Sequence, residues 1–128
     1  MRDASTVSAL IEADEYFKAI VYALTLAASE IFIAGWWLNV DLPLLRYPDK
    51  HPTTLRSLLL DAASNRNVRI YVLLYKEQAI AMPNNSQFAE EILSNLHPNI
   101  SALRHPHPLN VDATLWSHHE KLVIVDRR

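Results

Sequence analysis

The sequence predicts one α/β domain of three layers, with helices on both faces of a mostly parallel, mixed sheet. Segments with the 3.6-residue apolar period of helices alternate with short apolar segments rich in β-branched and aromatic residues. The connections between the strand-like segments are long enough to hold crossover helices, which favours parallel pairing. Because no internal repeat or linker divides the chain, residues 1–128 are expected to form a single domain.

The first half of the chain begins with a short predicted strand at residues 7–11. A helix is predicted from Asp14, a plausible N-cap, to about residue 28. Its buried stripe has the spacing i, i+3, i+4, i+7 and consists of Phe17, Ile20, Val21 and Leu24. Residues 30–37 form a buried strand, and the three prolines in residues 38–52 predict a loop.

The middle of the chain contains a second helix and the clearest strand. Thr53 or Thr54 caps the helix, which ends in the asparagine-rich residues 64–67. Its apolar stripe is Leu55, Leu58, Leu59 and Ala62. In residues 68–75 both the odd and the even positions are apolar, apart from Arg69. Both sides of such a strand are apolar, which predicts a central strand covered on both faces.

The last part of the chain supplies a third helix and two strands. Asn85 or Ser86 begins the helix, whose apolar side is Ala89, Ile92, Leu93 and Leu96. Residues 99–103 are predicted as a short strand, residues 104–114 as a loop, and residues 121–126 as the last strand.

Composition excludes several classes of protein. The chain is 50% hydrophobic and 20% charged, as globular proteins are, and its net charge of −2 without a basic stripe argues against nucleic-acid binding. It has no cysteine, so disulfides and thiolate metal sites are excluded. No apolar run approaches the roughly 18 residues of a membrane span, and no signal peptide is evident. We therefore expect a cytoplasmic protein, free or peripheral at membranes.

The strongest chemical signal lies at the last predicted strand. His119 and Lys121 are two residues apart, so on a strand they project to the same face. An imidazole can attack phosphorus or move a proton, and an ammonium stabilises the charge on the phosphate oxygens. Asp126 is seven residues beyond His119, roughly 23 Å along a strand, so its predicted role is supporting: an ion pair, a turn cap or the orientation of a partner. The pair alone does not establish a site, because such a pair at a strand end is most often a solvated edge.

The pattern H-x-K-x4-D, filled by His119, Lys121 and Asp126, resembles the HKD motif of the phospholipase D superfamily. Four further segments occur in the same order as in the first catalytic half of eukaryotic-type phospholipase D: "EIFIAGWWL", "VRIYVLLYKE", "LHPNI" and "RHP". The resemblance extends from about Ile11 to Asp126 and includes the segment "WSHHEKLVIVD".

The resemblance implies a two-step transfer of a phosphodiester. One histidine forms a phosphohistidine, a second protonates the leaving alcohol, and lysines bind the phosphate in place of a metal, so no cofactor and no metal are expected. His119 would be a catalytic histidine, Lys121 a phosphate ligand and Asp126 the supporting acid. The implied substrate is a phospholipid such as phosphatidylcholine at a membrane surface, and the product is phosphatidic acid.

The departures from the family pattern concern completeness. Such enzymes bring two HKD halves together, and this chain has one, without the Gly-Gly strand that follows the motif in the family. Its single glycine, Gly35, stands where relatives often have an acidic residue before the Trp-Trp pair. We therefore expect a truncated first half that is inactive alone. The alternatives are a single-motif phosphodiesterase or nuclease completed by homodimerisation, and a non-catalytic fragment or lipid-binding module.

Other residues are weaker candidates. Trp36 and Trp37 follow a strand and could line a substrate entrance, although such a pair is more often core and rim packing. His118 could shape the pocket, but a hydrogen-bonded packing histidine is the favoured interpretation. His105 and His107 have no carboxylate or cysteine set beside them to complete a metal site. Tyr71 and Tyr75 are predicted as core residues, while Lys76 and Glu77 belong either to a site or to a solvated turn.

One geometric condition can be tested. Sites in α/β sheets lie beyond the carboxyl ends of parallel strands, whereas His119 and Lys121 precede theirs. The strand at residues 121–126 should therefore run antiparallel to the strand at residues 68–75.

Overall fold

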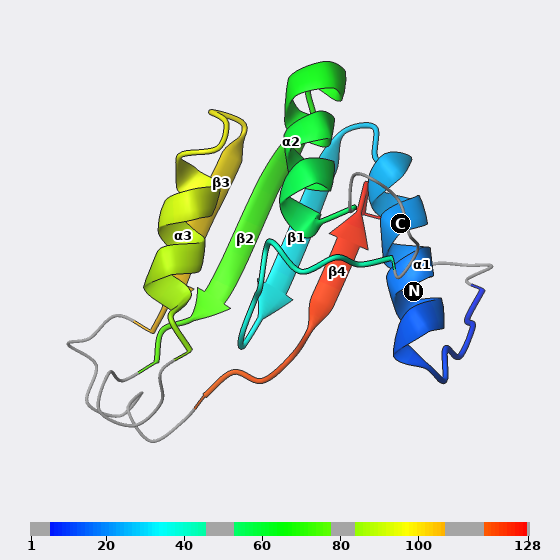
Figure 1. The fold of residues 1–128 in the computed structure, drawn as a ribbon, viewed down its shortest axis with the longest axis horizontal. Helices are drawn as coiled ribbons and strands as arrows, with labels where there is room; N and C mark the ends of the chain where they lie inside the picture. Colours follow the sequence, from blue (N-terminus) through cyan, green and yellow to red (C-terminus); the bar gives the residue numbers. More distant parts are fainter. Residues whose placement is uncertain (1–5, 46–52, 78–83, 107–116, 128) are drawn as a thin grey trace.

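The computed structural model describes residues 6–45, 53–77, 84–106 and 117–127. Their elements, in chain order, are α1 (Ala13–Thr25), β1 (Glu30–Gly35), α2 (Leu55–Arg66), β2 (Arg69–Tyr75), α3 (Ser86–Ser94), β3 (Ile100–His105) and β4 (Leu122–Val125). The four strands form one sheet in the order β3-β2-β1-β4 (Figure 1). β1, β2 and β3 are parallel, and β4 pairs antiparallel with β1, which confirms the predicted mixed, mostly parallel α/β fold.

The three helices lie on the same side of the sheet (Figure 1). Beneath them the strands bury alternate side chains, which meet buried leucines of the helices: Ile31, Ile33, Ile70, Val72, Leu74, Ile100 and Ala102 from the sheet, with Leu24, Leu59 and Leu93 from the helices. Alternation with period 2 follows from the pleat, so each strand sends its intervening residues to the other face. The core therefore lies between one face of the sheet and the helices.

The other face of the sheet is uncovered in the described part of the chain. β2 alternates between buried and exposed positions, and both Tyr71 and Leu73 are 39% exposed. Leu103 of β3 and Leu122 and Ile124 of β4 are also exposed. The prediction that residues 68–75 are covered on both faces is thus wrong, because the described helices form one layer on one face of the sheet, and the predicted helical layer on the other face is not among the described residues.

α2 begins and ends as the sequence predicts. The Thr54 hydroxyl accepts a hydrogen bond from the Ser57 N–H at 3.1 Å, and the Ser57 hydroxyl accepts one from the Thr54 N–H at 3.1 Å. This reciprocal capping box satisfies N–H groups that an α-helix leaves without partners in its first turn. Asn67 ends the helix in the left-handed conformation with φ 56°, a conformation that asparagine tolerates better than most residues.

α1 is shorter than predicted. Its N-cap is Glu12 instead of Asp14, whose carboxylate accepts a hydrogen bond from Lys18 at 2.6 Å within the helix. The helix ends at Thr25 instead of residue 28, because the carbonyl oxygens and N–H groups near its end form hydrogen bonds with side chains from other parts of the chain. Arg66 of α2 donates to the carbonyl oxygens of Leu24, Thr25 and Ala27. The N–H groups of residues 28–30 donate to the carboxylate of Asp126, after β4.

Two predicted boundaries depend on pairing and were wrong. Residues 7–11 are not a strand; Val7 is 90% and Ile11 is 91% exposed, and neither pairs with the described sheet. β3 extends through Arg104 and His105, which the sequence assigns to a loop, because β2 continues to pair with both residues. None of the helices in the described ranges is long and apolar enough to cross a bilayer.

Candidate active site

The start of β4 lies at the edge of the sheet where the three parallel strands end (Figure 1). β4 is antiparallel to β1, and β1 is parallel to β2, so the last strand runs antiparallel to residues 69–75. This confirms the geometric condition set by the sequence. The residues that precede β4 therefore share one edge with the residues that end β1, β2 and β3, where α/β proteins place their sites.

His119 and Lys121 lie together at this edge. Lys121 Nζ is 2.8 Å from Nδ1 and 3.0 Å from Nε2 of the His119 ring, and it donates to the His119 carbonyl oxygen at 2.7 Å. The prediction that the two side chains share a face is confirmed, and both are exposed to solvent. An imidazole and an ammonium are thus available to the same incoming anion.

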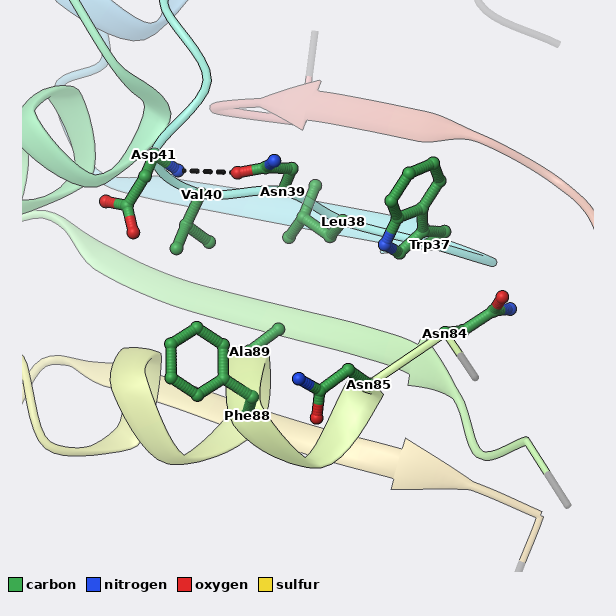
Figure 2. A pocket seen from close by; sticks show the side chains of 9 residues that line it. All are labelled: Trp37, Leu38, Asn39, Val40, Asp41, Asn84, Asn85, Phe88 and Ala89. Carbon is green, nitrogen blue, oxygen red and sulfur yellow. Dashed lines mark hydrogen bonds between the residues drawn. The ribbon is translucent and has the colours of Figure 1, made fainter. Parts of the chain in front are cut away.

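Trp36 forms a wall beside this pair, whereas Trp37 does not. The centroid of the Trp36 ring lies 5.4 Å from that of His119, and Lys121 Nζ lies 6.0 Å from the Trp36 centroid. Trp37 is 64% exposed and lines a separate groove with residues at the start of α3 (Figure 2). The structure therefore brings only the first of the two predicted tryptophans to the His119–Lys121 pair.

His118 and His119 precede β4 and contact different rings, His118 the ring of Tyr75 and His119 that of Trp36. The His118 ring packs edge-on against Tyr75 at 5.6 Å and 85°, and it lies 6.3 Å from the His105 ring. His118 Nδ1 is 3.3 Å from Glu120 Oε1, within ion-pair range, but neither buried ring nitrogen makes a hydrogen bond in the described structure. The packing expected of His118 is present, and the hydrogen bond expected with it is not.

Asp126 lies at the opposite end of β4 and does not touch the His119–Lys121 pair. Its carboxylate accepts hydrogen bonds from the N–H groups of Ala28, Ser29 and Glu30 at 3.0, 2.7 and 3.1 Å, and from the Ser29 hydroxyl at 2.8 Å. These hydrogen bonds, the one from the Ser29 hydroxyl first, hold the pKa of the Asp126 carboxyl far below its ordinary value. Asp126 fastens the end of β4 to the start of β1, and so acts on the site only through the placement of the strand.

Known proteins similar to this chain are phospholipases D. The chain is 43% identical over 124 residues to phospholipase D zeta 2 of Arabidopsis thaliana, which covers 97% of the chain. It is 38% identical over 117 residues to human phospholipase D1, and 39% identical over 112 residues to bovine phospholipase D2, which cover 91% and 88% of the chain. The chain belongs to the phospholipase D superfamily. It spans 12% of the length of the Arabidopsis relative, and no protein-family model matches it.

Tyr75 lies beside the candidate site, a position that the sequence did not predict. It was expected in the core, but it is half-buried at the end of β2 and stacks on Trp36 with an interplanar angle of 13°. With His118 on its other side, Tyr75 joins the residues that follow β1 to those that precede β4. Its place at the carboxyl end of a parallel strand was the signal that could have identified it.

Glu77 has a structural role. Its Oε1 accepts the Ser86 N–H at 2.9 Å and so caps α3. Burial would raise the pKa of the Glu77 carboxyl, but hydrogen bonds from Ser86 and the charge of Arg104 hold that pKa below its ordinary value. No group of three histidine, cysteine or acidic side chains in the described ranges could hold a metal, and His107 lies outside those ranges.

Proposed function

We propose that this chain carries one of two half-sites of a phospholipase D-type phosphodiesterase, with His119 as a catalytic histidine. The observation that supports this most is the contact of Lys121 Nζ with the His119 ring at the open edge of the sheet. The names of the relatives that match most of the chain support the same class of reaction.

The chemistry follows from the pair. A neutral imidazole has one nitrogen without a proton, and that nitrogen can accept a hydrogen bond from the Lys121 ammonium, which can only donate. An unprotonated nitrogen can attack phosphorus, while the ammonium moves to the phosphate oxygens that gain charge. A P–N bond forms as the bond to the leaving alcohol breaks, and the leaving oxygen takes a proton from a second histidine. Water then cleaves the P–N bond and releases the phosphate monoester.

The proposed substrate is a phospholipid such as phosphatidylcholine, and the proposed product is phosphatidic acid. Trp36 is placed to contact the head group, because its ring lies against both His119 and Lys121. A protein that acts on such a substrate works at a membrane surface, so we propose a peripheral, cytoplasmic location. No metal or nucleic-acid partner enters this proposal.

The second histidine must come from outside the single motif. In this proposal a second HKD half supplies it, and His119 is inactive without that half. The alternative is a homodimer in which two copies of His119 meet. The two hypotheses differ in the molar mass of the active species and are separable by experiment.

The test combines light scattering, an activity assay and phosphate binding on the purified chain. Wild type, His119→Asn, Lys121→Ala and the control Lys76→Ala would be compared. Lys76 follows β2 at the same edge of the sheet, and none of its described contacts is with His119. Hydrolysis of phosphatidylcholine vesicles would be measured, and inorganic phosphate would be titrated while the His119 ring signals are followed by NMR.

The proposal predicts an inactive monomer whose His119 signals shift with phosphate in wild type and Lys76→Ala. In Lys121→Ala the phosphate affinity should fall by about tenfold or more, because one charge-assisted contact is lost. Equal phosphate binding in Lys121→Ala would contradict the proposed site. A dimer whose activity disappears in His119→Asn would instead support the self-completing enzyme.

A further inference from the structure

A second groove lies away from the His119–Lys121 pair, between the loop that follows β1 and the first turns of α3 (Figure 2). We call it the loop groove. It is lined by Trp37, Leu38, Asn39, Val40, Asp41, Asn84, Asn85, Phe88 and Ala89. Its volume of about 240 Å³ is below the range of roughly 300 to 1,000 Å³ that drug-sized ligands occupy, so it suits a small ligand.

Among the described residues, the lining of the loop groove has no free charge. Asp41 is the one ionisable residue of this described lining, and its carboxylate is 2.6 Å from Nη2 of Arg56 on α2. The described part of the lining contains no lysine, arginine or histidine. An anion such as phosphate therefore finds no cation here, and a cation finds a carboxylate that is already paired.

Amide side chains supply unused hydrogen-bonding groups. Asn39 Oδ1 accepts the N–H groups of Asp41 and Leu42 at 3.0 and 3.1 Å, which leaves its Nδ2 without a described partner. Asn85 occupies the N-cap position of α3, yet its side chain makes no capping hydrogen bond. The Asn84 amide likewise has no partner in the described structure, where its Nδ2 is buried. An amide can both donate and accept, which matches a hydroxyl group.

Aromatic rings lie beside these amides in contact with solvent. Trp37 is 64% exposed and Phe88 is 54% exposed. An exposed ring offers a flat apolar surface to the C–H groups of a ligand, as aromatic side chains do at many interfaces. The loop groove thus combines flat apolar surface with neutral donors and acceptors.

We propose that the loop groove binds an uncharged polyhydroxylated ring, such as a single sugar residue. The C–H face of the ring packs on Trp37, and its hydroxyls bind the Asn85 amide beside it at the start of α3. The same chemistry is offered by a free monosaccharide and by the head group of an uncharged glycolipid. This proposal does not depend on the phosphodiesterase activity.

The experiment is saturation-transfer NMR on the chain with methyl β-D-galactopyranoside, choline chloride and inorganic phosphate as separate probes. Trp37→Leu removes the aromatic surface. Asn85→Gly removes an amide at a position with φ 51°, which glycine adopts freely. Tyr22→Leu is the matched control, because Tyr22 is 69% exposed on α1 and does not line the groove. Circular dichroism of each variant verifies the fold.

The galactoside should bind wild type and Tyr22→Leu equally, and about tenfold more weakly in Trp37→Leu and Asn85→Gly. Undiminished binding in both groove variants, no galactoside signal in wild type, or a stronger choline signal that Trp37→Leu removes would overturn the proposal. Co-flotation with phosphatidylcholine vesicles, with and without monogalactosyldiacylglycerol, distinguishes a glycolipid head group from a free monosaccharide as the ligand. Preference for the glycolipid vesicles identifies a lipid head group, and galactoside binding without that preference identifies a free sugar.

Discussion

The Asp126 carboxylate binds backbone groups that lie up to 98 residues earlier in the chain. Asp126→Asn replaces a charged acceptor with an amide that cannot satisfy the N–H groups of Ala28, Ser29 and Glu30 together. We expect the free energy of unfolding to fall by about 1 to 3 kcal/mol, measured by urea denaturation. Asp14→Asn, which breaks only an exposed pair with Lys18, should change it by less than about 1 kcal/mol. Equal losses in the two variants would show that the contacts of Asp126 are not stabilising.

The same carboxylate predicts a dependence of stability on pH. Because the pKa of Asp126 is lower in the folded chain than in the unfolded chain, the unfolded state binds the proton more readily. The stabilisation is complete above the unfolded pKa of about 3.9 and declines as the pH falls below it. Thermal unfolding at about pH 6 and about pH 3 should show a smaller loss of melting temperature in Asp126→Asn than in wild type. An identical loss would assign the acid sensitivity to other groups.

Single residues were predictable from the sequence where their partners are close in the chain. The contact between His119 and Lys121, two residues apart, is a local property of an extended chain. The partners of Asp126 and the stacking of Tyr75 on Trp36 depend on which strands become neighbours. Spacing along one segment does not contain that information.

At the scale of elements, α2 has the most complete local signals, and its N-terminus can be tested directly. Thr54→Ala removes the hydroxyl that accepts the Ser57 N–H, so we expect a loss of about 1 kcal/mol in the free energy of unfolding. Thr53→Ala is the matched control, because the described contact of Thr53 is its backbone carbonyl, which accepts the Leu44 N–H. Circular dichroism during urea denaturation measures both. If Thr53→Ala lowered the free energy of unfolding as much as Thr54→Ala does, the N-cap hydrogen bond of Thr54 would not explain the loss.

Elements with internal signals were predicted better than those defined by a neighbour. α2 and α3 begin where the sequence places an N-cap residue type before an apolar stripe, although only Thr54 of α2 makes a side-chain capping hydrogen bond. A strand, by contrast, exists only when another strand pairs with it. Residues 7–11 have strand composition without a described partner, and β3 continues through His105 because β2 does. The sequence reports the preference for an extended chain but not the partner.

At the scale of the whole molecule, one face of the sheet is a core and the other is a surface. β2 shows the difference at adjacent positions, since Leu74 is 1% and Leu73 is 39% exposed. Because β2 is apolar at both its odd and its even positions, the sequence predicted two covered faces. The uncovered face is apolar, and its exposed residues are Tyr71, Leu73, Leu103, Leu122 and Ile124. A contiguous apolar surface of this kind is typical of sites that contact another protein, a ligand or a membrane.

The same substitution at the two adjacent leucines separates core from surface. Leu74→Ala leaves a cavity beneath the helices and should lower the free energy of unfolding by about 2 to 5 kcal/mol. Leu73→Ala removes a side chain that already contacts water, so its cost should be below about 1.5 kcal/mol, and it should reduce the binding of a hydrophobic dye to the folded chain. Urea denaturation and dye fluorescence at equal protein concentration measure the two effects. Similar large costs at both positions would mean that the Leu73 face is covered in solution, by association of copies of the chain, and light scattering on the same sample would then detect the larger mass.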